Sequence, residues 1–283
     1  MKTENKPRGG TLYVVATPIG NLGDMTYRAV STLREVDFIA AEDTRVTGKL
    51  LSAYEIKTPL MAYHAHNFSV SGNRIISRLL SGYSCAIVTD AGMPCISDPG
   101  EDLVRLCRES GIDVRVVPGA CAAVSALAVS GLPTANFTFI GFVSVSERGR
   151  RETLERLTQR TETLIFYEAP HKLRRTLRDF ARYFPGRRLS LCRELTKVYE
   201  EVISGTTDEL ALRYADEQTV IKGEFVLILQ GKQEDDTPPD TDAALAFARM
   251  LTEDGIKKSE AAKQAAEKYG VNRRTIYESL TKS

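Results

Sequence analysis

The sequence has few of the side chains, and none of the spacings, that mark several common kinds of functional site. It contains three histidines, and its five cysteines form no C-x-x-C pair, so we expect no structural zinc site and predict no metal. The G-x-x-x-x-G-K-[ST] spacing is missing, which excludes a P-loop nucleotidase. The G-x-G-x-x-G dinucleotide fingerprint and the G-x-S-x-G nucleophile elbow are missing as well.

Long apolar runs are also missing, and none approaches the ~20 residues that a membrane-spanning helix needs. Residues 1–10 are polar and basic, so we expect a disordered leader and no secretory signal. The cysteines lie in apolar segments or small-residue loops, as reduced thiols do, which favours a cytoplasmic protein. With 283 residues, 42% of them hydrophobic, the chain has room for two globular domains.

Short apolar strands alternate with helical patterns along most of the chain. In the first half, strands are expected at 11–16, 36–41, 59–63, 86–89 and 113–117, and in the second half at 137–142, 163–167, 189–192, 202–203 and 224–229. This alternation predicts βαβ units and a mainly parallel sheet in the first half. We therefore predict an α/β fold with two α/β domains, at 11–131 and 132–232.

The last fifty residues have a different composition. Residues 233–240 are acidic and contain two prolines, so we expect a linker there. Residues 241–283 contain helical patterns at 243–251, 259–269 and 273–280, with a glycine turn at 270–272. This tail is typical of a helix-turn-helix that contacts nucleic acid, and equally of a small helical hairpin that docks on a domain or a dimer partner.

Residues 86–100 form the segment around which the chain is organised. A buried strand at 86–89 runs into a loop that contains two prolines and two glycines. Such a loop at the carboxyl end of a strand suits a ligand-binding site. The alternative is an ordinary turn into a helix, with Asp98 as the N-cap and Pro99 in the first helical turn. That alternative does not explain why residues 90–94, which come before this turn, also contain a glycine and a proline.

The net charge is only +1, but the positive charges are concentrated in two regions. Residues 147–193 contain thirteen Lys and Arg against six Asp and Glu, and residues 257–283 contain seven against three. The first region is rich in arginine and predicts a phosphate-contacting face. The arginines that we expect on this face are Arg148, Arg150, Arg151, Arg156, Arg160, Arg174, Arg175 and Arg178. The aromatic residues Phe137, Phe139, Phe142 and Tyr167 are expected in the core.

Four segments resemble the tetrapyrrole methylase-like family of S-adenosylmethionine-dependent methyltransferases. They are residues 16–24, 41–45, 90–100, and 117–120 followed by 125–127. The resemblance extends over about residues 11–230, and within the family it is to the branch that 2′-O-methylates a cytidine of 16S ribosomal RNA. It implies a cofactor cleft between the two domains, S-adenosylmethionine as cofactor, the small ribosomal subunit as partner, and a homodimer.

The same resemblance implies the residues that contact the cofactor. They are Pro18, Ala91, Gly92, Met93, Ile96, Cys121, Ala122, Tyr167, Glu168 and Gly205. Tetrapyrrole-acting members commonly have Gly-Gly-Asp-Pro where this chain has Ala-Gly-Met-Pro at 91–94, which disfavours a porphyrin substrate. A small-molecule methylase and a nucleic-acid-binding regulator with an inactive methylase body remain the alternative functions.

A ribose hydroxyl is a poor nucleophile until a base accepts its proton. Glu42 matches the position of an acidic residue implicated in catalysis in tetrapyrrole-acting relatives, and we expect it to act as the base or to orient the hydroxyl. Asp43, Arg45 and His66 are the further catalytic candidates, Arg45 as a phosphate ligand and His66 because imidazole titrates near neutrality. The alternative for residues 42–45 is a helix cap with a local ion pair.

Overall fold

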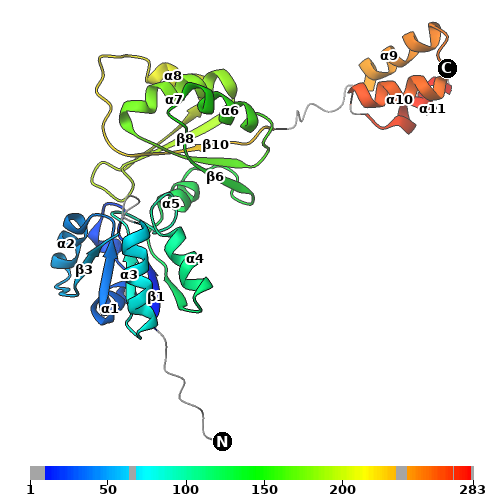
Figure 1. Ribbon diagram of the computed structural model, residues 1–283. Coiled ribbons are helices and arrows are strands. Elements are labelled where there is room, and N and C mark those ends of the chain that lie inside the picture. The colour runs from blue at the N-terminus through cyan, green and yellow to red at the C-terminus, as the bar shows by residue number, and fades with distance from the viewer. Residues whose placement is uncertain (1–9, 64–67, 234–240, 270, 282–283) are drawn as a thin grey trace, which may run out of the picture. The chain divides into compact units, whose positions relative to one another are not determined.

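The computed structural model describes residues 10–63, 68–233, 241–269 and 271–281. The chain divides into two compact units, with the boundary in the sequence between Lys232 and Gln233 (Figure 1). The first unit contains two β-sheets with their helices, and the second contains three short helices. The predicted arrangement of two α/β sheets followed by C-terminal helices is therefore confirmed.

The first sheet is entirely parallel and has the strand order β3-β2-β4-β1-β5. Its strands are β1 (Thr11–Val15), β2 (Phe38–Ala41), β3 (Leu60–Ala62), β4 (Cys85–Val88) and β5 (Asp113–Val117). Every residue of β2 and β4 is buried, because helices cover both faces of a parallel sheet, and these strands therefore read as continuous apolar runs. The helices of this half are α1 (Tyr27–Glu35), α2 (Thr44–Ala53), α3 (Phe68–Leu80), α4 (Glu101–Glu109) and α5 (Ala122–Val129), and the last of them packs on the second sheet.

The start of α4 corrects one sequence-based alternative. The N-cap is Gly100, which has φ +133° and makes no side-chain cap hydrogen bond. A Cβ atom at Gly100 would lie 2.6 Å from the Cys95 sulfur, so only glycine fits there. Asp98 is therefore not the N-cap and Pro99 is not in the helix. This leaves the Asp98 carboxyl available for contacts outside the helix.

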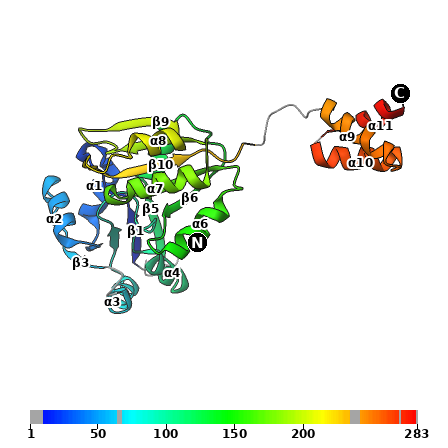
Figure 2. The same cartoon turned by 90° about the horizontal axis from the view of Figure 1, so that it is seen from above.

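The second sheet is mixed, with the strand order β6-β7-β10-β8-β9. Its strands are β6 (Phe137–Phe142), β7 (Thr163–Glu168), β8 (Arg188–Arg193), β9 (Glu201–Thr206) and β10 (Phe225–Leu229). Only β6 and β7 pair in parallel, and the other pairs are antiparallel. The helices α6 (Glu147–Leu157), α7 (Pro170–Tyr183) and α8 (Thr207–Arg213) are grouped over one face, which carries the large apolar core of this half (Figure 2).

The other face of the second sheet packs against α5, the last helix of the first half (Figure 1). Ala126 and Leu127 of α5 belong to one buried cluster with Ile165 of β7 and Ile228 of β10. Ala123, Ala126 and Leu127 are the buried residues of this helix, while Val124 and Val129 on its other side are exposed. The joint brings the carboxyl edge of the first sheet against the second sheet.

The C-terminal unit has a small core of its own. The helices α9 (Thr241–Glu253), α10 (Lys258–Tyr269) and α11 (Arg273–Thr281) contact one another in all three pairs. Alanines from α9 and α10 allow close packing around Ile276 and Leu280 of α11. The Asn272 side chain accepts a hydrogen bond from the Arg274 N–H at 2.8 Å, which caps α11. Among the described helices, none is both long and apolar enough to cross a membrane.

Candidate active site

Two loops at the carboxyl edge of the first sheet are joined through their backbones. Thr17 follows β1 and Gly92 follows β4, and each N–H donates to the carbonyl of the other residue, at 2.9 and 3.1 Å. The Thr17 hydroxyl also donates to the Thr89 carbonyl at 3.1 Å. β1 and β4 are neighbours in the sheet. The connection from β1 to β2 runs toward one edge of the sheet, and the connection from β4 to β5 runs toward the opposite edge. This is the topological switch point, where open α/β sheets bind ligands.

The loop after β4 has an unusual backbone. Gly92 has φ +86°, and a Cβ atom there would lie 3.3 Å from the Ile19 side chain, so glycine lets the two loops approach closely. Cys95 and Ser97 are not glycine, yet they have φ values of +71° and +64°. Each such residue costs about 1–3 kcal/mol, and strain of this kind concentrates at functional sites.

A cavity of about 510 Å³ opens beside these loops. The first half contributes Ile19, Ala91, Gly92, Met93, Ile96, Ser97, Asp98, Cys121 and Ala122 to its lining. The second half contributes Phe142, Tyr167, Glu168, Ala169, Pro170, His171, Cys192, Leu195, Glu224, Phe225 and Val226. The walls are mainly apolar with a few polar groups, which is the usual composition of a small-molecule site.

Tyr167, in the wall that the second sheet provides, is hydrogen-bonded to a helix of the first half. Its phenol oxygen accepts a hydrogen bond from the Ala123 N–H at 3.2 Å, at the start of α5. The rings of Phe139 and Phe142 contact it edge-on, with centroids 5.0 and 5.7 Å away. Burial raises the pKa of Tyr167 to about 12, so the phenol stays protonated at neutral pH.

The carboxyl groups of Glu42 and Asp98 both lie close to the Thr89 hydroxyl. This hydroxyl donates to Glu42 Oε2 at 2.8 Å, and the Asp98 side chain lies close to the same hydroxyl. Asp98 lines the cavity, whereas Glu42, the residue directly after β2, is not among the lining residues. Burial, followed by the nearby charge of Glu42, raises the pKa of Asp98 to about 6. Thr89 thus connects the predicted catalytic carboxyl to the cavity wall.

The chain matches the model of the family described as tetrapyrrole (corrin/porphyrin) methylases over residues 11–211. It belongs to this methylase family. Ribosomal RNA small subunit methyltransferase I of Halalkalibacterium halodurans is 49% identical over 272 residues, which cover 95% of this chain and 93% of that protein. The protein of the same name from Bacillus subtilis is 44% identical over 283 residues, which cover 98% and 96% of the two chains.

Several solved structures share the fold. Uroporphyrin-III-C-methyltransferase from Thermus thermophilus superimposes with a TM-score of 0.55 at 21% identity, and covers 78% of this chain and 94% of that one. A diphthine synthase superimposes with a TM-score of 0.59 at 12% identity, and covers 79% and 90% of the two chains. At these identities the likeness establishes the fold alone.

The structure brings together eight of the ten residues predicted to contact the cofactor. Ala91, Gly92, Met93, Ile96, Cys121, Ala122, Tyr167 and Glu168 all line the cavity. Pro18 does not line it, although the adjacent Ile19 does. Gly205 lies in β9, where it pairs with Leu189 and packs against Glu209, and it is not among the lining residues.

Asp43 and Arg45 form the helix cap and ion pair that the sequence analysis kept as an alternative. The Asp43 carboxylate accepts from the Arg45 N–H at 2.8 Å and from its guanidinium at 2.7 Å. These bonds lower the pKa of Asp43 to about 2, and the Arg45 side chain is largely exposed. His66 falls outside the described residues. Of the four catalytic candidates, Glu42 alone contacts the network at the cavity in the part of the chain that the structure describes.

The predicted arginine face is partly neutralised by its own carboxylates. Ion pairs join Arg148 to Glu152, Arg150 to Asp179, Arg151 to Glu155, Arg160 to Glu162 and Arg175 to Glu147. Arg174 donates to the backbone carbonyls of Tyr214 and Thr219. Arg156 and Arg178, like the neighbouring exposed Arg182, have no ion pair with any residue that the structure describes. These are the side chains best placed to contact phosphate.

Sequence reasoning missed most of the wall that the second sheet provides. Phe142 was expected in the core but is 56% exposed and lines the cavity, and Phe137 is likewise exposed. Cys192, Leu195 and residues 224–226 carry no local motif, because their position depends on how the second sheet packs on α5. Ser97 and Asp98 lie in the loop that the sequence singled out, although neither residue was named as a ligand.

Proposed function

We propose that this methylase transfers a methyl group from S-adenosylmethionine to the ribose 2′-hydroxyl of a cytidine in 16S ribosomal RNA of the small subunit. The proposal is based on sequence similarity: the chain is 44–49% identical, over nearly its full length, to two ribosomal RNA small subunit methyltransferases. We further propose that the protein acts in the cytoplasm as a homodimer.

The cavity fits the cofactor. The small side chains of Ala91, Gly92 and Ala122 leave room for a flat adenine ring, and the apolar wall around them suits it. S-adenosylmethionine carries positive charge, and the cavity offers the carboxyls of Asp98, Glu168 and Glu224. When bound, the cofactor supplies a methyl group on a sulfonium, which is an electrophile with a neutral leaving group.

The residues around the cavity have three tasks. The loops after β1, β4 and β5 orient the methyl donor, since reaction needs the acceptor oxygen in line behind the methyl. The apolar walls exclude water, which would otherwise compete as the acceptor. Glu42, held by the Thr89 hydroxyl, accepts the 2′-hydroxyl proton or orients that hydroxyl. The exposed Arg156, Arg178 and Arg182 attract the RNA backbone.

The test is transfer of tritiated methyl groups to small subunits from a strain that lacks the protein. Label is expected on one cytidine, in a dinucleotide that resists alkaline cleavage because its 2′-hydroxyl is blocked. Subunits from the complemented strain are the matched control and should accept no label. Label on a base, or no label on RNA, would refute the proposal. Sedimentation of the purified protein at monomer mass would refute the homodimer.

A further inference from the structure

A line of buried polar side chains leads from the cavity wall into the space between α6 and α7. Glu168 ends β7, lines the cavity and is only 4% exposed. Its Oε1 accepts from the Ala169 N–H at 2.9 Å, and its Oε2 accepts from the hydroxyl of Thr176 on α7. Arg150, which is 4% exposed, reaches from α6 and donates to the Thr176 oxygen at 2.7 Å.

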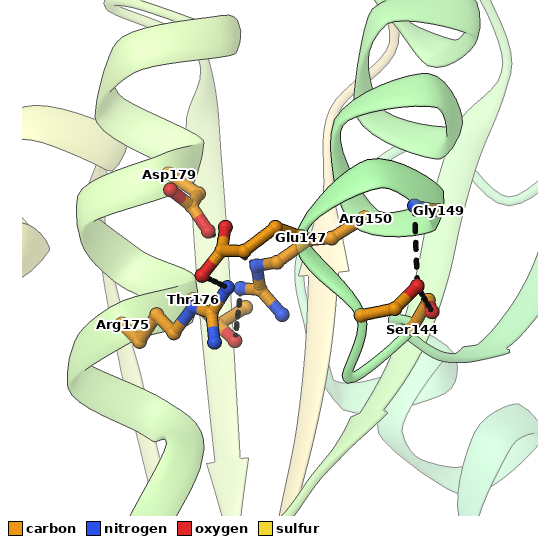
Figure 3. Close-up of polar contacts among 8 residues, drawn as sticks. Ser144, Glu147, Gly149, Arg150, Arg175, Thr176 and Asp179 are labelled. Atoms are coloured by element: carbon orange, nitrogen blue, oxygen red, sulfur yellow. Dashed lines mark hydrogen bonds and ion pairs between the residues drawn. The ribbon is translucent and has the colours of Figure 1, made fainter.

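Arg150 lies between Thr176 and Asp179, which are one turn apart on α7 (Figure 3). Its Nε donates to the Asp179 carboxylate, so the buried guanidinium has a counter-ion. Glu147 and Arg175 form a second ion pair between the same helices, at 2.6 Å. The arginine that sequence reasoning placed on a phosphate-contacting face is therefore committed to an internal network.

The direction of the hydrogen bonds in this network is determined by the groups themselves. A guanidinium only donates, and a carboxylate only accepts. The Thr176 hydroxyl has one proton, and because its oxygen accepts from Arg150, that proton is given to Glu168. Both Glu168 oxygens are thereby held, and each retains a further lone pair for an acceptor role in the cavity.

We propose that Thr176 and Arg150 are positioning residues for Glu168, and that they hold its carboxylate ready to accept a hydrogen bond from a hydroxyl or amino group of the methyl donor. This inference rests on the proposed function, because it takes the cavity as the site of that donor. Neither Thr176 nor Arg150 lines the cavity, so they act on the ligand only through Glu168.

The competing interpretation is that the network only holds α6 against α7. Both interpretations predict a loss of stability when the network is broken, because Thr176 is fully buried. They differ in ligand affinity, which the positioning role alone would change. The experiment therefore measures the dissociation constant of S-adenosylhomocysteine, an unreactive ligand, by calorimetry, beside the thermal midpoint.

Thr176→Val removes the hydroxyl at nearly constant volume, and we expect it to weaken binding about tenfold, the typical effect of losing one hydrogen bond to a charged group. Thr176→Ser restores the hydroxyl and should bind nearly as the wild type does. Thr207→Val is the matched control, since Thr207 is also fully buried and donates to the Phe184 carbonyl away from the cavity. It should lower the midpoint without changing affinity.

A double-mutant cycle decides whether Thr176 acts through Glu168. In a Glu168→Ala background, Thr176→Val should weaken binding less than about twofold, since the carboxylate that the Thr176 hydroxyl holds is absent. A full and additive loss, or unchanged affinity in Thr176→Val alone, overturns the proposal. If Thr176→Val does not fold, Arg150→Met combined with Asp179→Asn removes the donor to Thr176 and its counter-ion together, and a smaller loss of affinity is expected because the Thr176 hydroxyl still donates to Glu168. Wild-type protein that does not bind S-adenosylhomocysteine would instead contradict the proposed function.

Discussion

Replacing Asp98 by asparagine should stabilise the protein at neutral pH and not in acid. The half-buried Asp98 carboxyl has its pKa raised to about 6 by burial and by Glu42, whereas an unfolded aspartate titrates near ~3.9. Between these two values the folded state binds a proton that the unfolded state has released, so stability falls as pH rises through this window. Above about pH 6 the full penalty of the charged form is present.

The size of the effect follows from the shift. Two pKa units correspond to roughly 3 kcal/mol, and because Asp98 is only half buried, solvent screening reduces this to about 1–2 kcal/mol. For a body of this size that is a rise of about 2–8 °C in the unfolding midpoint at pH 7.5. Asparagine keeps the shape of the side chain and removes its charge. The gain should shrink steadily as the pH is lowered from 7.5 to 4.5.

The assay is thermal unfolding of both proteins in a series of buffers between pH 4.5 and 8, at constant ionic strength. Asp24→Asn, which removes an exposed carboxylate in the short 3₁₀ turn Leu22–Asp24, controls for the loss of one negative charge. A difference between wild type and Asp98→Asn that stays constant across this range would show that the carboxyl titrates normally. The electrostatic account of the cavity wall would then be wrong.

Three further predictions concern the reaction and the RNA. Glu42→Ala should lower turnover about a hundredfold with cofactor affinity near wild type, and Thr89→Val should lower turnover in the same way but less, because it only frees the carboxyl. Unchanged single-turnover rates would remove both residues from the mechanism. Deletion of residues 240–283 should weaken RNA binding, measured by filter retention, more than cofactor binding; unchanged RNA affinity would make the tail structural. Charge reversal at Arg178 and Arg182 should reduce the slope of log affinity against log salt by about 1–2; an unchanged slope would exclude α7 from the RNA surface.

The order of elements and the location of the ligand loops were predictable from local patterns. The strands were visible as apolar runs, and the loop at 90–100 was visible as a cluster of prolines and glycines. Eight residues predicted to contact the cofactor do line one cavity, because they lie in the loops that follow β4 and β5, at the start of α5, or at the end of β7. The domain boundaries and the roles of the site residues stay predictions.

The amino-acid sequence by itself determined which segments form strands and helices, because the periodicity of apolar side chains and the turn residues act over a few neighbours. It also determined that the loops after β1, β4 and β5 gather at one edge, since parallel strands end together. Only the tertiary structure decided that Asp98 faces a cavity, that Arg150 is buried beside Thr176, and that β8 and β10 supply a wall. Those facts depend on how the second sheet packs on α5 and how α6 packs on α7, and such contacts between distant segments leave no local pattern.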